Sequence, residues 1–225
     1  MISASTNNPM RFNSSLPISI EVLEKLNFDR YKLLLGTKEF TTKSQKELEQ
    51  GAKYWGSFGK GKAGIITISN LIKKPSFLQK ENCFLDIDLG EFFTQLSKVP
   101  SPISTFKEWV LENLAKKETT KEEFLIYSDI LLALKEEIIH LPLRYNSNAT
   151  ILQVKLSRNY MEFYCAYENL GALKGYVNGE MLELEVLFNQ TLYFLKSVGI
   201  ASHISISKPI DPLFSSDRVM LDLKG

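Results

Sequence analysis

The alternation of apolar and polar residues is most regular between residues 160 and 207, where it predicts several strands and one short helix. Leu182, Leu184 and Val186 alternate with glutamates, which predicts a strand with one buried face. Asn178-Gly179 comes just before this strand and predicts a two-residue hairpin turn, because both positions tolerate a positive φ. The other expected elements are extended runs over Tyr160–Tyr167 and Ala172–Val177, a helix over Gln190–Val198 between Asn189 and Gly199 as caps, and a last strand over Ser202–Ser207. The stretch therefore predicts a mostly antiparallel sheet with one covering helix.

The first hundred residues contain shorter extended runs. Tyr31–Gly36, Gly51–Phe58 and Ala63–Ser69 are rich in aromatic or β-branched residues and predict strands, with one more short strand expected over Phe84–Asp88. Glycines inside such runs often mark bends, so we expect a curved sheet or a partly open barrel. Ile18–Leu26 has its apolar residues at helical spacing and predicts a short helix.

Between these two regions the apolar spacing changes to that of helices. Val99–Pro102 carries two prolines and predicts a linker, after which we expect a helix from Thr105 to about Ala115. Thr120 and Glu123 form a capping-box pattern for a second helix. Its apolar stripe is Phe124, Tyr127, Leu131, Leu134 and Ile138, and we expect it to stop at Leu141-Pro-Leu143, before a strand over Leu152–Leu156.

These elements predict an α+β protein with three parts. Residues 1–17 are rich in Ser and Asn and are expected to form a loose tail. Residues 18–98 are expected to form a small β-rich domain. Residues 103–225 are expected to form the domain with helices and a mostly antiparallel sheet.

Composition and charge exclude several classes of protein. Of 225 residues, 44% are hydrophobic and 24% charged, as in an ordinary globular protein, and the 27 basic residues nearly cancel the 26 acidic ones. No apolar run is long enough to span a membrane and no secretory signal pattern is present, so we expect no membrane insertion. The protein is expected to be cytoplasmic, and its polar N-terminus is interpreted either as a frayed tail or as an unfolded export signal. Cys83 and Cys165 are too few for a disulfide framework and predict buried thiols in a reducing compartment.

The residues with reactive side chains form no catalytic or metal-binding pattern. Gly56–Ala63 misses the phosphate-loop pattern because Ala63 replaces the hydroxyl residue, so a hairpin loop is expected there. Asp86 and Asp88 lack a third carboxylate at useful spacing for a cation. His140 is expected at a helix C-terminus and His203 on a solvent-facing strand position. We expect no enzyme activity, no cofactor and no metal.

One segment is basic and aromatic. Between Gly51 and Lys80 the chain has six lysines and no acidic residue, with Tyr54, Trp55 and Phe58 interleaved. Single-stranded nucleic acid is often bound by such a surface. The alternative, which we favour, places the aromatics in the core and the lysines on a solvated face. The candidate residues of this patch are Lys53, Trp55, Lys60, Lys62, Lys73 and Lys74.

The back half resembles the C-terminal domain of the flagellar hook-length control family. The similar segments, in order, are Leu141-Pro-Leu143, Ile151–Lys155, Asn169-Leu-Gly171, Leu182–Phe188, Leu192–Leu195 and Ile204–Ile206. Leu170 and Gly171 match the last two positions of the family's leucine–x–proline–x–x–leucine–glycine signature, whereas Cys165 and Tyr167 replace its leucine and proline.

The resemblance implies a non-enzymatic protein of the bacterial flagellar type III export system, with a role in hook-length control and export substrate switching. The implied partner is the export gate or another flagellar protein. The implied partner-binding residues are Asn169, Leu170, Gly171, Leu173 and Gly175. The chain lacks the long Pro-, Gln- or Ser-rich ruler segment usual in the family, which is the pattern of a shortened paralogue or an accessory protein.

Overall fold

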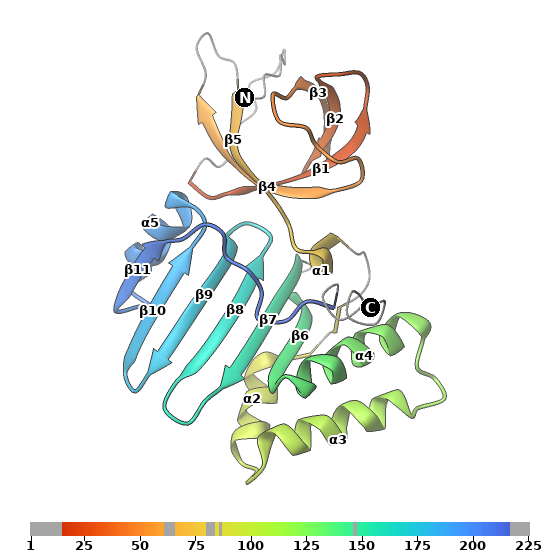
Figure 1. Ribbon diagram of the computed structural model, residues 1–225, viewed down its shortest axis with the longest axis vertical. Helices are drawn as coiled ribbons and strands as arrows, with labels where there is room; N and C mark the ends of the chain where they lie inside the picture. The colour runs from red at the N-terminus through yellow and green to blue at the C-terminus, as the bar shows by residue number, and fades with distance from the viewer. Residues whose placement is uncertain (1–14, 61–65, 80–83, 86, 146–147, 217–225) are drawn as a thin grey trace, which may run out of the picture.

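The structure is a computed structural model that describes residues 15–60, 66–79, 84–85, 87–145 and 148–216. Within these residues the chain forms two sheets and a set of helices, an α+β fold as predicted (Figure 1). The first sheet has strand order β3-β2-β1-β4-β5 and the second has the order β11-β10-β9-β8-β7-β6.

The first sheet is antiparallel and open. Its strands are β1 (Ile18–Lys25), β2 (Arg30–Leu35), β3 (Lys38–Lys43), β4 (Lys53–Lys60) and β5 (Ile66–Lys73). The described residues leave β3 and β5 as its two edges, so the sheet does not close into a barrel. Ile20, Val22, Tyr31, Leu33 and Tyr54 are buried in its core.

The predicted helix over Ile18–Leu26 is wrong, because this segment is strand β1. Ile20 and Val22 are almost completely buried and lie on one face of the strand. The strand pairs with β2 on one side and β4 on the other, which satisfies its backbone from both sides. The period of two between its β-branched residues therefore prevails over the helical spacing that Val22 and Leu26 suggest.

Four helices connect or cover the sheets in the middle of the chain. They are α1 (Ser76–Gln79), α2 (Leu89–Ser97), α3 (Pro102–Leu114) and α4 (Lys121–Lys135). The predicted capping box of α4 is confirmed, since the Thr120 hydroxyl accepts from the Glu123 backbone N–H and the Glu123 carboxylate accepts from the Thr120 N–H. Pro102, expected in a linker, is the first residue of α3.

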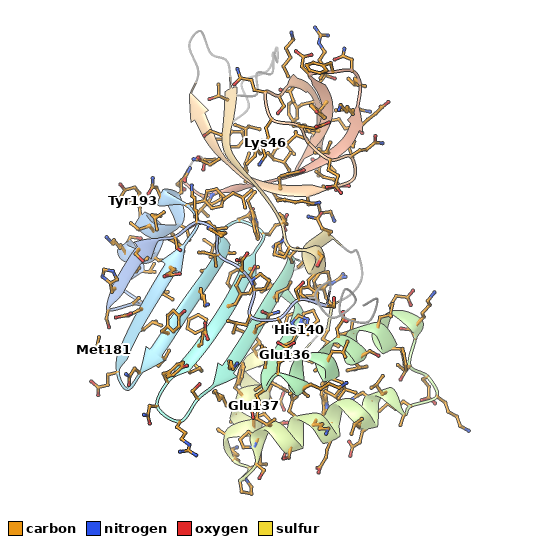
Figure 2. All side chains as sticks on the ribbon, in the orientation of Figure 1. Lys46, Glu136, Glu137, His140, Met181 and Tyr193 are labelled. Carbon is orange, nitrogen blue, oxygen red and sulfur yellow. The ribbon has the colours of Figure 1, made fainter. Side chains whose placement is uncertain are left out.

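The predicted end of α4 is wrong, and so is the expected place of His140. The helix ends at Lys135, and Glu137 takes a φ of 59° in the turn that follows (Figure 2 labels Glu136 and Glu137). Ile138 and His140 therefore belong to strand β6 (Ile138–Tyr145). Ile138 keeps the helical spacing of Leu131 and Leu134 although it lies in the strand. The helix itself ends before it, and the chain turns at Glu137 with its positive φ.

The second sheet contains the four strands expected from residues 160–207, which are β8 (Met161–Tyr167), β9 (Gly171–Asn178), β10 (Met181–Val186) and β11 (His203–Ile206). It also contains β7 (Asn148–Leu156), which was expected over Leu152–Leu156, and β6, which the sequence did not predict as a strand. Neighbours are antiparallel except β10 and β11, which are parallel because helix α5 (Asn189–Val198) connects them. Gly199 closes α5 with a φ of 65°, as predicted, whereas Phe188 and not Asn189 is its N-cap.

The two faces of the second sheet are covered differently. Helices α2, α3 and α4 pack against one face at β6 and β7, and α5 packs against the same face at β10 and β11. Part of the opposite face is crossed by residues 207–214, which run from the end of β11 toward β6 and which we call the strap (Figure 1). The strap and strand β4 of the first sheet meet over the same end of this face.

Candidate functional site

Trp55 and its neighbours join the first sheet to the second. The Trp55 side chain comes from β4, is 1% exposed, and donates from its indole Nε1 to the Tyr167 carbonyl oxygen at 3.0 Å. Two residues further along β4, the Ser57 hydroxyl donates to Gln190 Oε1 of α5 at 3.3 Å. We call this contact region, where β4 meets the β8–β9 turn and α5, the junction.

An ion pair between a buried lysine and a half-buried glutamate reinforces the junction. Lys74 follows β5, and its side chain is 1% exposed. Its Nζ lies 2.8 Å from Glu168 Oε2 in the β8–β9 turn and 2.6 Å from the Ser19 hydroxyl of β1. Burial lowers the pKa of Lys74, and Glu168 opposes that effect. Burial alone would raise the pKa of Glu168, but Lys74 and Ser19 outweigh it and hold the pKa below its ordinary value.

The residues implied as partner-binding lie at or beside this turn, and most of them point inward. Asn169 is exposed and Leu170 is half-buried, with its carbonyl oxygen accepting from the Thr191 hydroxyl at 2.6 Å. Gly171, Leu173 and Gly175 are buried. A Cβ on Gly175 would lie 2.2 Å from Phe163 Cζ, so this glycine is needed for close packing between strands. Only the tip of the turn is open to a partner.

The structure separates the members of the basic and aromatic patch. Trp55 and Lys74 are buried at the junction and have partners there. Lys73 is exposed and forms an ion pair with Glu49, while Lys53 is half-buried. The side chain of Lys60 and the whole of Lys62 lie outside the described residues. Trp55 in this position is 1% exposed, so its ring does not lie on the outer surface, where a nucleic-acid strand could stack on it.

A cavity of about 620 Å³ opens onto the surface at the junction. The first sheet contributes Trp55 and Ile72, the second contributes Tyr164 and Leu187, and the strap contributes Lys208 and Ile210 among others. Trp55, Tyr164, Leu187 and Ile210 are buried, whereas Lys208 is exposed, so the cavity leads from the surface to an apolar floor. We call it the junction cavity.

Beside the cavity, a buried hydrogen-bond network fastens the strap to the sheet. The Gln153 side chain on β7 donates from Nε2 to the Phe214 carbonyl at 2.8 Å and accepts from the Phe214 N–H at 3.1 Å. Gln153 Nε2 also lies 3.1 Å from His140 Nδ1 (Figure 2 labels His140). The imidazole packs against the rings of Phe77 and Phe214, and its complete burial lowers its pKa to about 3. His140 is therefore a neutral core residue.

Among the described residues, the remaining reactive side chains singled out in the sequence do not gather into a site. Asp88 accepts from the Glu91 backbone N–H at 2.8 Å and caps α2, while Asp86 and Cys83 lie outside the described residues. Cys165 is buried, and burial raises the pKa of its thiol to about 12. His203 is exposed on β11, as predicted. Across the described part of the chain, no three His, Cys, Asp or Glu residues form a metal-binding group.

An exposed apolar surface lies on the outer side of α5. Tyr193 is 69% exposed, Val198 and Ile200 are each 51% exposed, and Phe194 is 41% exposed. Thr191 and Leu195 on the opposite side of the helix are buried against the sheet. We call the four exposed residues the α5 surface; Tyr193 is labelled in Figure 2. The surface lies beside β11, which is an edge of the sheet among the described residues.

Sequence reasoning missed Glu168, Gln153 and Tyr164, which the structure brings to the junction and the strap. Glu168 directly precedes the predicted Asn169-Leu-Gly171 turn, but nothing in the sequence pairs it with Lys74, 94 positions away. No sequence signal marks Gln153, because it alternates with Leu152 and Val154 as a solvent-facing residue would, yet it is completely buried.

Within the described residues, no helix combines the length and the apolar character needed to cross a bilayer. Comparison with known proteins gave no matching family model, no matching curated protein and no matching solved structure.

Proposed function

We propose that the protein is a non-enzymatic docking protein of the bacterial flagellar export system, with a role in hook-length control and export substrate switching. The observation that carries the docking function is the α5 surface. Three apolar side chains exposed on α5, together with Ile200 just after its C-cap, are costly to leave in water, and neighbouring exposed apolar groups often mark interaction sites. An aromatic residue such as Tyr193 is also a common anchor of protein interfaces.

The choice of a flagellar partner is supported by where the family-like segments lie. Ile151–Lys155, Leu182–Phe188 and Ile204–Ile206 fall mainly on β7, β10 and β11 of one sheet. Leu192–Leu195 falls on α5, the helix that carries the exposed surface. The family-like segments therefore lie in the second sheet and in α5, the part of the molecule that carries the proposed docking surface.

The first test is deletion of the gene in its own organism, with hook length measured by electron microscopy. We expect hooks of abnormal length and reduced motility. Normal hooks and normal motility in the deletion strain would contradict the flagellar role.

The second test separates the α5 surface from other exposed apolar residues. Complementation with Tyr193→Asp is expected to fail, because a carboxylate at the centre of the surface opposes burial against a partner. Phe124→Asp is the matched control, since Phe124 is 53% exposed on α4 and lies outside the α5 surface. Equal complementation by the two variants would remove the α5 surface as the docking site.

Binding of single-stranded nucleic acid stays a hypothesis for the segment between Gly51 and Lys80. The burial of Trp55 and Lys74 removes two of its six candidate residues. Fluorescence anisotropy with labelled oligonucleotides would detect binding that weakens steeply as salt rises. An absence of binding at low salt would end this hypothesis.

A further inference from the structure

The junction cavity has the size and lining of a small-molecule site. Its volume of about 620 Å³ lies within the range of roughly 300–1,000 Å³ that such sites occupy. Buried apolar groups line its floor, and the polar groups are few, which is the usual composition of a ligand pocket. The walls come from both sheets and from the strap, so the cavity exists only in the fully assembled fold.

One polar group of the floor has no partner among the described residues. Tyr164 is completely buried, and no hydrogen-bond partner lies within reach of its hydroxyl. Buried hydroxyls are nearly always hydrogen-bonded, so this one requires an explanation. Burial is the main factor that raises the pKa of Tyr164, and the phenol therefore stays neutral and retains an O–H to donate.

The mouth of the cavity indicates the charge of a ligand. Lys208 is exposed there, with its Nζ 5.9 Å from the centre of the Phe188 ring, and no described carboxylate lies within ion-pair distance. Lys73 also borders the cavity but is already paired with Glu49. Asp211 borders the same opening and disfavours a second negative charge. Lys208 can therefore pair with one anionic group of a ligand, and the Asp211 carboxylate beside it opposes a second.

We propose that the junction cavity binds a small, mostly apolar molecule with one anionic group, such as an aromatic carboxylate or sulfonate. Its ring packs on the floor between Trp55 and Leu187, its anionic group faces Lys208, and Tyr164 donates a hydrogen bond to it. The site is independent of the α5 surface, since none of its lining residues belongs to that surface.

The test uses anilinonaphthalene sulfonate, an aromatic sulfonate whose fluorescence rises in apolar surroundings. The chain has two tryptophans, so Trp109→Phe leaves Trp55 as the only one. In this variant we expect saturable binding at one site together with quenching of Trp55 by energy transfer. Probe fluorescence without any change at Trp55 would place the probe elsewhere and overturn the proposal.

Two substitutions test the polar contacts. Tyr164→Phe removes only the hydroxyl and is expected to weaken probe binding roughly threefold to tenfold, without lowering the melting temperature. Lys208→Ala is expected to weaken binding and to reduce its salt dependence.

Tyr160→Phe and Lys196→Ala are the matched controls, being the same changes outside the cavity, and both are expected to bind the probe as the wild type does. Equal affinities for Tyr164→Phe and Tyr160→Phe would overturn the assigned role of the hydroxyl. A variant truncated after Ser216 gives a further check. If the probe bound this variant but not the full chain, residues after Ser216 and not a small molecule would be the occupant of the cavity, and the proposal would be overturned.

Discussion

His140 illustrates how a single hydrogen bond fixes the state of a buried side chain. The two hydrogen bonds between Gln153 and the Phe214 backbone identify which Gln153 atom is nitrogen, because the carbonyl accepts and the N–H donates. That nitrogen faces His140 Nδ1 and can only donate, so Nδ1 must be unprotonated. Protonation of Nδ1 would place two donors opposite each other in a completely buried site, and this is consistent with burial lowering the pKa of His140 to about 3.

The low pKa of His140 predicts that the protein loses stability in mild acid. The unfolded chain binds this proton near pH 6.5, whereas the folded chain binds it only near pH 3. Between these values the unfolded state holds more protons, so the free energy of unfolding falls as the pH falls. The contribution is about 2 kcal/mol between pH 6.5 and pH 5, at roughly 1.4 kcal/mol per pH unit.

Urea denaturation at pH 7 and pH 5 measures this effect in the wild type and in His140→Gln. The variant is expected to be less stable at pH 7, because it loses ring contacts with Phe77 and Phe214, but to lose less stability on going to pH 5. His203→Gln makes the same change at an exposed position of β11 and should keep the wild-type slope. The same slope in both variants would show that His140 does not carry the effect.

At the scale of elements, the sequence predicted those elements that carry a turn or cap signal next to a regular pattern. The Asn178-Gly179 signal located the β9–β10 hairpin to within one residue, since Asn178 ends β9 opposite Met181 and the turn residues are Gly179, with a positive φ, and Glu180. Thr120 with Glu123 located the start of α4. The predictions failed where no such signal marks a boundary. Nothing between Lys135 and Ile138 breaks the helical spacing in the sequence, because the positive φ falls on Glu137, an ordinary residue.

Gly175 gives an element-scale prediction in strand β9. Its missing Cβ makes room for the Phe163 ring of β8 and for Leu184 of β10. Gly175→Ala is therefore expected to lower the free energy of unfolding by about 2 kcal/mol, through overpacking between strands. Phe163→Leu in the same chain should recover part of this loss, because it removes the ring that the new methyl group meets.

Gly179→Ala provides a matched comparison for Gly175→Ala. A Cβ on Gly179 meets nothing within 4 Å, so only its φ of 61° opposes the change. Its cost is expected to be about 1 kcal/mol and not to change when Phe163 is replaced. If Phe163→Leu improved both glycine variants equally, overpacking would not be the cause in β9.

At the scale of the whole molecule, the junction is the feature that sequence patterns could not predict. A period of two or 3.6 residues identifies an element and its buried face, but it carries no information about which distant face it meets. The burial of Trp55 agrees with the favoured interpretation that the aromatic residues of this segment lie in the core, but no sequence pattern indicates that Trp55 joins one hydrophobic cluster with Phe188. The contacts of Lys74 with Glu168 and of Ser57 with Gln190 likewise join positions about a hundred residues apart.

Because Trp55 and Lys74 are buried at the junction, the junction is expected to couple the unfolding of the two sheets. Glu168→Gln leaves the Lys74 ammonium without its carboxylate in a site where the lysine side chain is 1% exposed. Loss of one partner of such a pair costs about 3 kcal/mol or more. Glu47→Gln removes a partner of the exposed Lys25 pair and is expected to leave the urea midpoint almost unchanged, because solvent and salt screen an exposed ion pair.

Two probes distinguish coupled from local unfolding in these variants. Far-ultraviolet circular dichroism reports on all elements, and Trp55 fluorescence in a Trp109→Phe background reports on the junction. If the buried cluster couples the sheets, both probes should give the same urea midpoint in the wild type, and Glu168→Gln should lower both together. A junction transition at lower urea than the dichroism transition would mean that the ion pair and Trp55 hold two independently stable bodies in contact.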